Sequence, residues 1–165
     1  EGDATLMVGQ RFEREVPTTV LFAFNRYDLS PEARATLDRQ AAWIRQFPEV
    51  RFRVYGHTDL VGTNRYNYGL GLRRAQAVVA YLTSRGIGTA RLEAVSSFGE
   101  TRPVINTLSP EQRNRHTVTE VIGFTARSVD LLNGKYAAII WREYVGSAVR
   151  PIETISGTQS EVAGG

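Results

Sequence analysis

The chain has 165 residues, of which 42% are hydrophobic and 22% charged, as expected for one ordinary globular domain with short extensions. It contains no cysteine, which excludes disulfides, thiolate metal sites and a thiol nucleophile, and no run of about 18 apolar residues typical of a membrane helix. The net charge is +3, but the basic residues are scattered along the chain, so we do not expect a nucleic-acid-binding protein.

Residues 1–17 are predicted to form an irregular N-terminal extension, because glycines and a proline interrupt any regular pattern. Within it, 6–8 and 11–14 predict at most a short strand. Residues 18–24 are rich in β-branched and aromatic side chains and predict the first strand of the domain.

A first domain helix is predicted to begin after Ser30, whose hydroxyl can cap free N–H groups, with Pro31 and Glu32 suited to the first turn. Apolar residues follow at helical spacing: Leu37, Ala41 and Ile44. Pro48 ends the helix.

Residues 50–57 alternate between apolar and polar side chains, which predicts a strand with one buried and one solvated face. His57 falls on the face expected to be solvated. Because a helix connects this strand to the preceding one, the two strands are expected to be parallel neighbours joined by a right-handed crossover.

The second helix is predicted to be capped by Thr63 or Asn64 and to run to about Arg85. Its buried stripe consists of Ala75, Val78, Val79 and Leu82. Asn67 and Arg74 lie on a neighbouring face, about 10 Å apart along the axis.

The rest of the chain predicts a strand over 91–98, a helical turn started by a capping box at Ser109, and a strand over 117–126. Residues 127–165 form a C-terminal extension, in which we predict a helix over 134–146 followed by a mobile Gly-, Ser- and Thr-rich tail. The pair Asn133–Gly134 would also suit a hairpin turn.

Asp59 and Arg74 bring opposite charges to the same end of this strand–loop–helix unit. A carboxylate and a guanidinium at fixed separation suit a zwitterionic ligand, because both would make charge-assisted contacts. The alternatives are a loop carboxylate that caps a turn, and an arginine on a solvated helix face that pairs with Asp59.

Several separated motifs, taken together, resemble the OmpA-like family of peptidoglycan-binding domains. They are 20–25 (Val-Leu-Phe-Ala-Phe-Asn), Gly56-His57-Thr58-Asp59 with Gly62, Asn67-x-x-Leu70-x-x-x-Arg74-Ala75-x-x-Val78, Tyr81-Leu82, Gly86-Ile87, Gly99 and Pro103. The resemblance covers residues 18–126. It implies an α+β fold, a β-α-β-α-β-β two-layer sandwich with a mixed sheet and helices on one face.

The resemblance also implies a function, which is non-covalent binding of peptidoglycan through the diaminopimelate of its stem peptide. Such a domain would lie in the periplasm and tether an outer-membrane or envelope protein to the wall. The family's ammonium-binding aspartate corresponds to Asp59 and its carboxylate-binding arginine to Arg74. Further candidate contacts are Asn25, Thr58, Asn67 and Arg115, the first three with turn and cap roles as alternatives.

This chain departs from the family pattern at two points. Gly71 replaces a usual serine, which weakens local helix propensity by up to about 1 kcal/mol. His116 replaces the second arginine of a usual Asn-Arg-Arg-Val, which leaves ligand contact by Arg115 or His116 open.

We expect no enzyme, cofactor or metal. The two histidines lie far apart in the sequence, and neither a Gly-x-Ser-x-Gly elbow nor a phosphate-binding glycine loop occurs. The rival function is a protein–protein interaction module of an envelope or motor complex with the same fold and no wall ligand.

Overall fold

The computed structural model describes residues 2–123, with side chains from residue 8 onward. In chain order its elements are helix α1 (Gly2–Glu15), strand β1 (Thr19–Leu21), helix α2 (Pro31–Arg45), strand β2 (Arg51–His57), helix α3 (Asn64–Ser84), the short helix η1 (Thr89–Arg91), strand β3 (Leu92–Gly99), the short helix η2 (Gln112–Asn114) and strand β4 (His116–Ile122).

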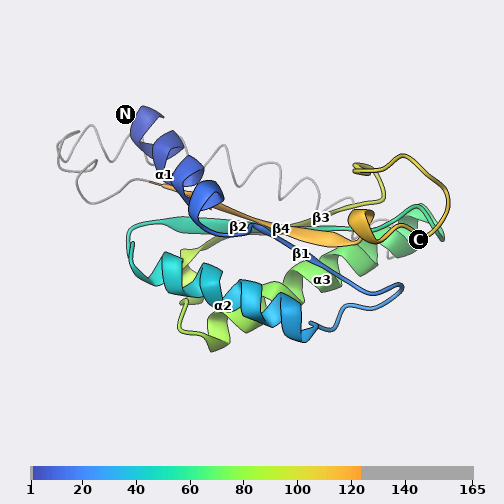
Figure 1. Cartoon of the computed structure of the whole chain (residues 1–165), viewed down its shortest axis with the longest axis horizontal. Coiled ribbons are helices and arrows are strands. Elements are labelled where there is room, and N and C mark those ends of the chain that lie inside the picture. Colours follow the sequence, from blue (N-terminus) through green and yellow to red (C-terminus); the bar gives the residue numbers. More distant parts are fainter. Residues whose placement is uncertain (1, 124–165) are drawn as a thin grey trace.

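The four strands form one mixed sheet in the order β1-β4-β2-β3. β2 and β3 are parallel, whereas β4 runs antiparallel to both β1 and β2. β1 and β2 are therefore not neighbours as predicted, because β4 lies between them. α2 and α3 lie on one face of this sheet (Figure 1). The α+β architecture with a mixed sheet is therefore confirmed.

The core lies between the sheet and these two helices. It is built from the alternate apolar residues of β2, Phe52 and Val54, which have no exposed surface, together with apolar stripes of the helices. The fully buried helix residues include Leu37 and Ile44 of α2, and Ala75, Val78 and Leu82 of α3. Burying one large apolar side chain stabilises the fold by about 1.5–3 kcal/mol, so this interface dominates the stability.

The helix starts agree with the sequence. Ser30 Oγ accepts a hydrogen bond from the N–H of Ala33 at 3.0 Å, and Pro31 occupies the first turn of α2. Thr63, rather than Asn64, caps α3 by accepting from the N–H of Tyr66 at 3.1 Å.

The N-terminal extension is helical, so the prediction of an irregular segment with a short strand was wrong. α1 carries Val8 and Phe12, four residues apart, and Val16 follows directly after its end; all three are buried in the core. The Phe12 ring meets the Trp43 ring of α2 edge-on at a centroid distance of 5.0 Å. This tertiary packing overrides the low helix propensity of the glycines.

α1 packs beside β4 at the edge that β1 is too short to cover (Figure 1). A Cβ on Gly9 would lie 3.1 Å from the carbonyl oxygen of Val121, so the glycine allows this close approach. The helix thus shields a stretch of β4 edge.

β1 ends at Leu21, three residues earlier than predicted. Past this point the carbonyls of Phe22 and Ala23 accept hydrogen bonds from arginine side chains instead of continuing a strand ladder. Residues 22–29, hereafter the 22–29 loop, therefore turn away from the sheet toward α3.

The helical turn before β4 is capped by Glu111, whose side chain accepts from the N–H of Arg113, and not by Ser109 as expected. β4 begins at His116 and ends at Ile122. Residues 124–126 of the predicted strand, and the predicted helix over 134–146 with its tail, lie outside the described residues.

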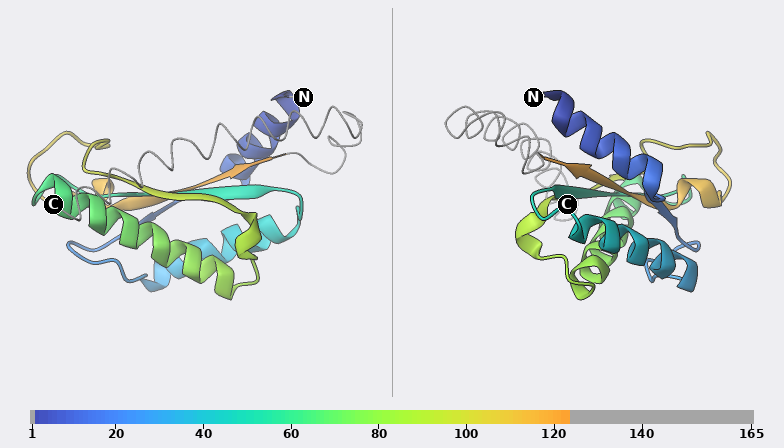
Figure 2. Two further views of the ribbon diagram at one scale, coloured as in Figure 1. Left: turned by 180° about the vertical axis from the view of Figure 1, so that it is seen from behind. Right: turned by 60° about the vertical axis from the view of Figure 1, so that its left-hand side comes forward.

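α3 approaches β2 very closely where two glycines face each other. A Cβ on Gly56 would lie 1.7 Å from the carbonyl oxygen of Gly71. Gly71, the departure from the family pattern, thus belongs to a backbone-to-backbone contact. This contact sets the first half of α3 directly over the end of β2, where the site lies (Figure 2).

Candidate functional site

Asp59 lies two residues beyond the end of β2 and is only 4% exposed. Its carboxylate forms an ion pair with Arg115, with 2.9 Å between Oδ2 and Nη1. It also accepts weaker hydrogen bonds from the N–H groups of Val61 and Glu111, each at 3.3 Å. These three donors use about three of the four lone-pair positions of the carboxylate, and the fourth, on Oδ1, has no hydrogen-bond donor among the described residues.

Arg74 has no exposed surface, so it does not lie on a solvated helix face, which was the alternative considered for it. Its guanidinium donates to three backbone carbonyls: Arg26 at 2.8 Å, His57 at 2.9 Å and Ala23 at 3.2 Å. Burial lowers the pKa of Arg74 to about 10, although the negative charge of Asp59 opposes that shift. The guanidinium therefore remains charged at neutral pH and ties the 22–29 loop to the end of β2.

Asp59 and Arg74 are brought to the same region, but the ion pair of Asp59 is made with Arg115. Arg115 comes from the segment just before β4, 56 positions away in sequence. Its Nε also donates to the Phe22 carbonyl at 2.9 Å, and its side chain is 12% exposed. The structure thus places Arg115 directly at the site, beside Asp59.

The remaining candidates take different positions. Asn67, 1% exposed, donates to the carbonyls of Asp59 and Val61 and to the Glu100 carboxylate, so it holds the loop after β2 in shape. Thr58 Oγ1 donates to the Asp59 carbonyl at 2.9 Å. Asn25 stands at the rim, where its side-chain oxygen accepts from the Tyr66 hydroxyl.

His57 is 7% exposed and does not lie on a solvated face, contrary to expectation. Its ring stacks on the His116 ring at a centroid distance of 4.3 Å and an interplanar angle of 7°. Burial, with the nearby His116 and Arg102, lowers the pKa of His57 to about 3, and burial also lowers the pKa of His116. Both rings are therefore neutral at neutral pH, packed side by side on β2 and β4.

Sequence reasoning missed the backbone N–H of Glu111 and the carboxylate of Glu100 as site neighbours. Both belong to the segment between β3 and β4, which carries no periodic pattern. The glutamate after Pro110 could have marked a turn whose free N–H groups point at an anion.

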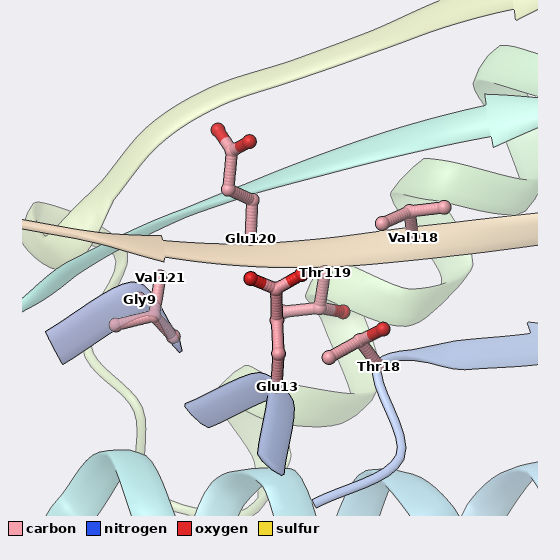
Figure 3. A pocket seen from close by; sticks show the side chains of 7 residues that line it. All are labelled: Gly9, Glu13, Thr18, Val118, Thr119, Glu120 and Val121. Atoms are coloured by element: carbon pink, nitrogen blue, oxygen red, sulfur yellow. The ribbon is translucent and has the colours of Figure 1, made fainter. Parts of the chain in front are cut away.

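A small cavity of about 90 Å³ lies elsewhere, between α1 and β4. Figure 3 shows its lining, with Glu13 extending from α1 toward β4. Its ionisable residues are Glu13 and Glu120, and Glu120 is already paired with Arg53 at 3.0 Å. Its described lining residues offer two carboxylates and no cation, so it lacks the paired opposite charges of the Asp59 site.

The described part of the chain lacks two further kinds of feature. No helix there is both long and apolar enough for a membrane crossing. No group of three or more His, Asp or Glu side chains there has the arrangement to hold a metal ion.

Similarity to known proteins identifies the family to which this fold, with its charged site in the loops, belongs. The OmpA family model matches residues 21–117. Peptidoglycan-associated lipoprotein from Rhizobium meliloti is 37% identical over 74% of this chain and 70% of its own length. The corresponding protein of Haemophilus influenzae is 41% identical over 53% of this chain and 56% of its own.

Solved structures of related proteins have the same fold. The peptidoglycan-associated lipoprotein of Burkholderia pseudomallei superimposes with a TM-score of 0.60 at 30% identity, covering 63% of this chain and 89% of that one. The periplasmic domain of Helicobacter pylori MotB gives 0.54 at 22% identity, over 75% and 80%, and shares the fold.

The chain therefore belongs to the OmpA family. This family is structural and not enzymatic, which confirms the expectation of a non-enzymatic protein. Neither the domain limits of 18–126 nor the ligand contacts of the individual residues are tested by these matches, and they stay predictions.

Proposed function

We propose that this domain binds peptidoglycan non-covalently through the diaminopimelate of the stem peptide and so anchors an envelope protein to the cell wall. The observation that carries the proposal is the nearly buried Asp59–Arg115 pair at the end of β2. In a member of the OmpA family, whose relatives include peptidoglycan-associated lipoproteins, such a pair has a natural ligand. It is the amino-acid head group of diaminopimelate, which carries one ammonium and one carboxylate.

Asp59 takes the ammonium in this proposal, at the open lone-pair position of Oδ1. The ligand carboxylate is taken by the guanidinium of Arg115, which keeps N–H groups beyond those used by Asp59 and Phe22. Arg74 contributes a second guanidinium once the ligand displaces the carbonyls of the 22–29 loop. Thr58 and Asn67 hold the loop that presents Asp59, and Asn25 lies at the entrance.

The proposed cellular location rests on the same similarity to known proteins. A chain related to peptidoglycan-associated lipoproteins and to periplasmic MotB domains would work in the periplasm, associated with the envelope. Attachment to the outer membrane is the specific form that the lipoprotein relatives support.

The test is a titration of the folded domain with meso-diaminopimelate, together with a pull-down on purified peptidoglycan. Each charge-assisted contact contributes about 1.5–3 kcal/mol, so Asp59→Asn and Arg115→Gln should each weaken binding at least about tenfold. Arg74→Ala should also weaken it. The matched control is Arg73→Ala, an exposed arginine next to Arg74 on α3, which should bind normally.

Normal binding by Asp59→Asn and by both arginine variants would rule out this site. Failure of the folded wild-type domain to bind either probe would favour the rival function, an interaction module without a wall ligand. Circular dichroism of every variant separates lost contacts from lost folding.

A further inference from the structure

The sheet has a second face, on the side away from α2 and α3 (Figure 1). Strand side chains alternate between faces, so Phe52 and Val54 enter the core while their neighbours on β2 point to the opposite side. We call this opposite side the distal face. Its apolar and aromatic side chains, placed by the pairing of β2 with β3 and β4, are Tyr55, His57, Ala94, Phe98, Val118 and Ile122.

The aromatic side chains of the distal face pack against one another. The ring centre of Phe98 on β3 lies 5.3 Å from that of Tyr55 and 5.4 Å from that of His57, both on β2. His57 in turn stacks on His116 of β4. The rings thus form a continuous row across three strands, which is a surface suited to packing against another layer of the fold.

Two apolar residues of the distal face are already removed from solvent. Ala94 and Ile122 are each 4% exposed, but neither belongs to the core that α2 and α3 cover. α1 packs beside β4, whereas Ala94 lies on β3, two strands farther along the sheet. None of the helices α1, α2 and α3 therefore accounts for the burial of Ala94.

The chain bends as it leaves the sheet. Gly123, the first residue after β4, has a φ of 115°, which residues with a side chain rarely adopt, so the strand does not continue. Residues 123–133 link β4 to the helix predicted over 134–146, and such a link can span up to about 36 Å. This reach is enough to return the predicted helix to any part of the distal face.

The predicted helix has the pattern and the size to cover this face. Its apolar stripe follows the spacing i, i+3, i+4, i+8 and consists of Tyr136, Ile139, Ile140 and Tyr144. At 1.5 Å per residue the helix would be about 20 Å long, close to the roughly 23 Å of β2, and its width of about 10 Å equals the distance across three strands. A helix this short is marginal in water alone, so it needs an apolar surface to pack on.

We propose that residues 134–146 form a helix that packs its apolar stripe on the distal face, so that the chain covers its own sheet on both sides. A segment of the same chain is favoured over a second copy, because the short link holds it near the face at a high effective concentration. The inference does not depend on a wall ligand, so it can hold or fail independently of the proposed function.

The test compares two matched variants of the full chain, Ile140→Glu in the apolar stripe and Ala138→Glu on the opposite side of the predicted helix. Ile140→Glu should shift the NMR signals of the Ala94 and Val118 methyl groups. It should also lower the melting temperature by about 5 °C, because it places a charge against an apolar surface. Ala138→Glu should do neither.

Nuclear Overhauser contacts in the wild type supply a direct second readout, since they should join the methyl protons of Ile140 to the ring protons of Tyr55 or Phe98. A sample mixed from isotope-labelled and unlabelled chains identifies the occupant of the face. Contacts between labelled and unlabelled chains would overturn the proposal and assign the distal face to a second copy. Unchanged methyl signals in Ile140→Glu would also overturn it and leave the face to a different partner, as would equal effects of the two variants.

Discussion

Asp59 and Arg115 form an ion pair that is almost completely removed from water, with side-chain exposures of 5% and 12%. At this degree of burial the two charges lose much of their hydration, and their attraction offsets this loss only while both are present. Arg115 therefore has a structural role in the ligand-free domain, because it is the ion-pair partner of Asp59. In the proposed complex, the ligand ammonium would be a second cation beside a carboxylate that is already ordered.

We predict that Arg115→Gln lowers the free energy of unfolding by about 3 kcal/mol, since it leaves a buried carboxylate without its ion-pair partner. Asp59→Asn added to that variant should recover part of the loss, because the unpaired charge is then gone. Urea unfolding of the wild type, both single variants and the double variant measures this coupling. Simple additivity of the two substitutions would contradict the prediction.

At the scale of elements, the packing of α3 on β2 depends on glycine at two facing positions. The Cβ of any other residue at Gly56 would overlap the Gly71 carbonyl group, which is backbone and cannot rotate away. Gly69, two residues before Gly71 on α3, has nothing within 4 Å of its Cβ position. A side chain at Gly56 would therefore push α3 away from β2, whereas a side chain at Gly69 has free space.

We predict that Gly56→Ala destabilises the domain by about 3 kcal/mol or more, because α3 must move off the sheet. Gly69→Ala should instead stabilise it by about 0.5–1 kcal/mol through higher helix propensity. Thermal unfolding of both variants provides the measurement. A neutral Gly56→Ala would show that this close approach is not required for stability.

Helices and strands that are determined by residues close in sequence were predicted correctly. Features that depend on contacts between distant parts of the chain were not predicted. The caps Ser30 and Thr63 and the alternation of β2 were sufficient because each acts within a few residues. The burial of Arg74 depends on carbonyls 17 to 51 positions away, for which no local pattern exists. α1 was missed although Val8 and Phe12 are four residues apart and share one helical face, because the glycines were given more weight.

At the scale of the whole molecule, the stacked histidines link stability to pH. The pKa of His57 in the folded protein is about 3, well below its ordinary value of 6.5. A group whose pKa is lowered by folding contributes its full stabilisation above the ordinary pKa and loses it as the pH falls. Since the folded state excludes the proton, acid favours unfolding, beginning near pH 6.5.

We predict that the free energy of unfolding falls by roughly 2 kcal/mol between pH 6.5 and 5, on account of His57. Denaturant titrations at both pH values test this, and His57→Phe, which keeps an aromatic ring in the stack, should show a smaller decrease. Carboxyl groups contribute little in this window, because their ordinary pKa values, 4.5 for Glu111 for example, lie below it. An equal decrease in His57→Phe would assign the effect to other groups.

The helix α1 beside β4 has a consequence for behaviour at high concentration. Without it, the N–H and C=O groups of β4 near Val121 would be open to a strand from another molecule. A protein fixed to a polymer is held at a high local density, where repeated strand addition between copies would lead to aggregates. α1 lies before residues 21–117, which the family model matches, so the helix that covers this part of the β4 edge lies outside the matched region.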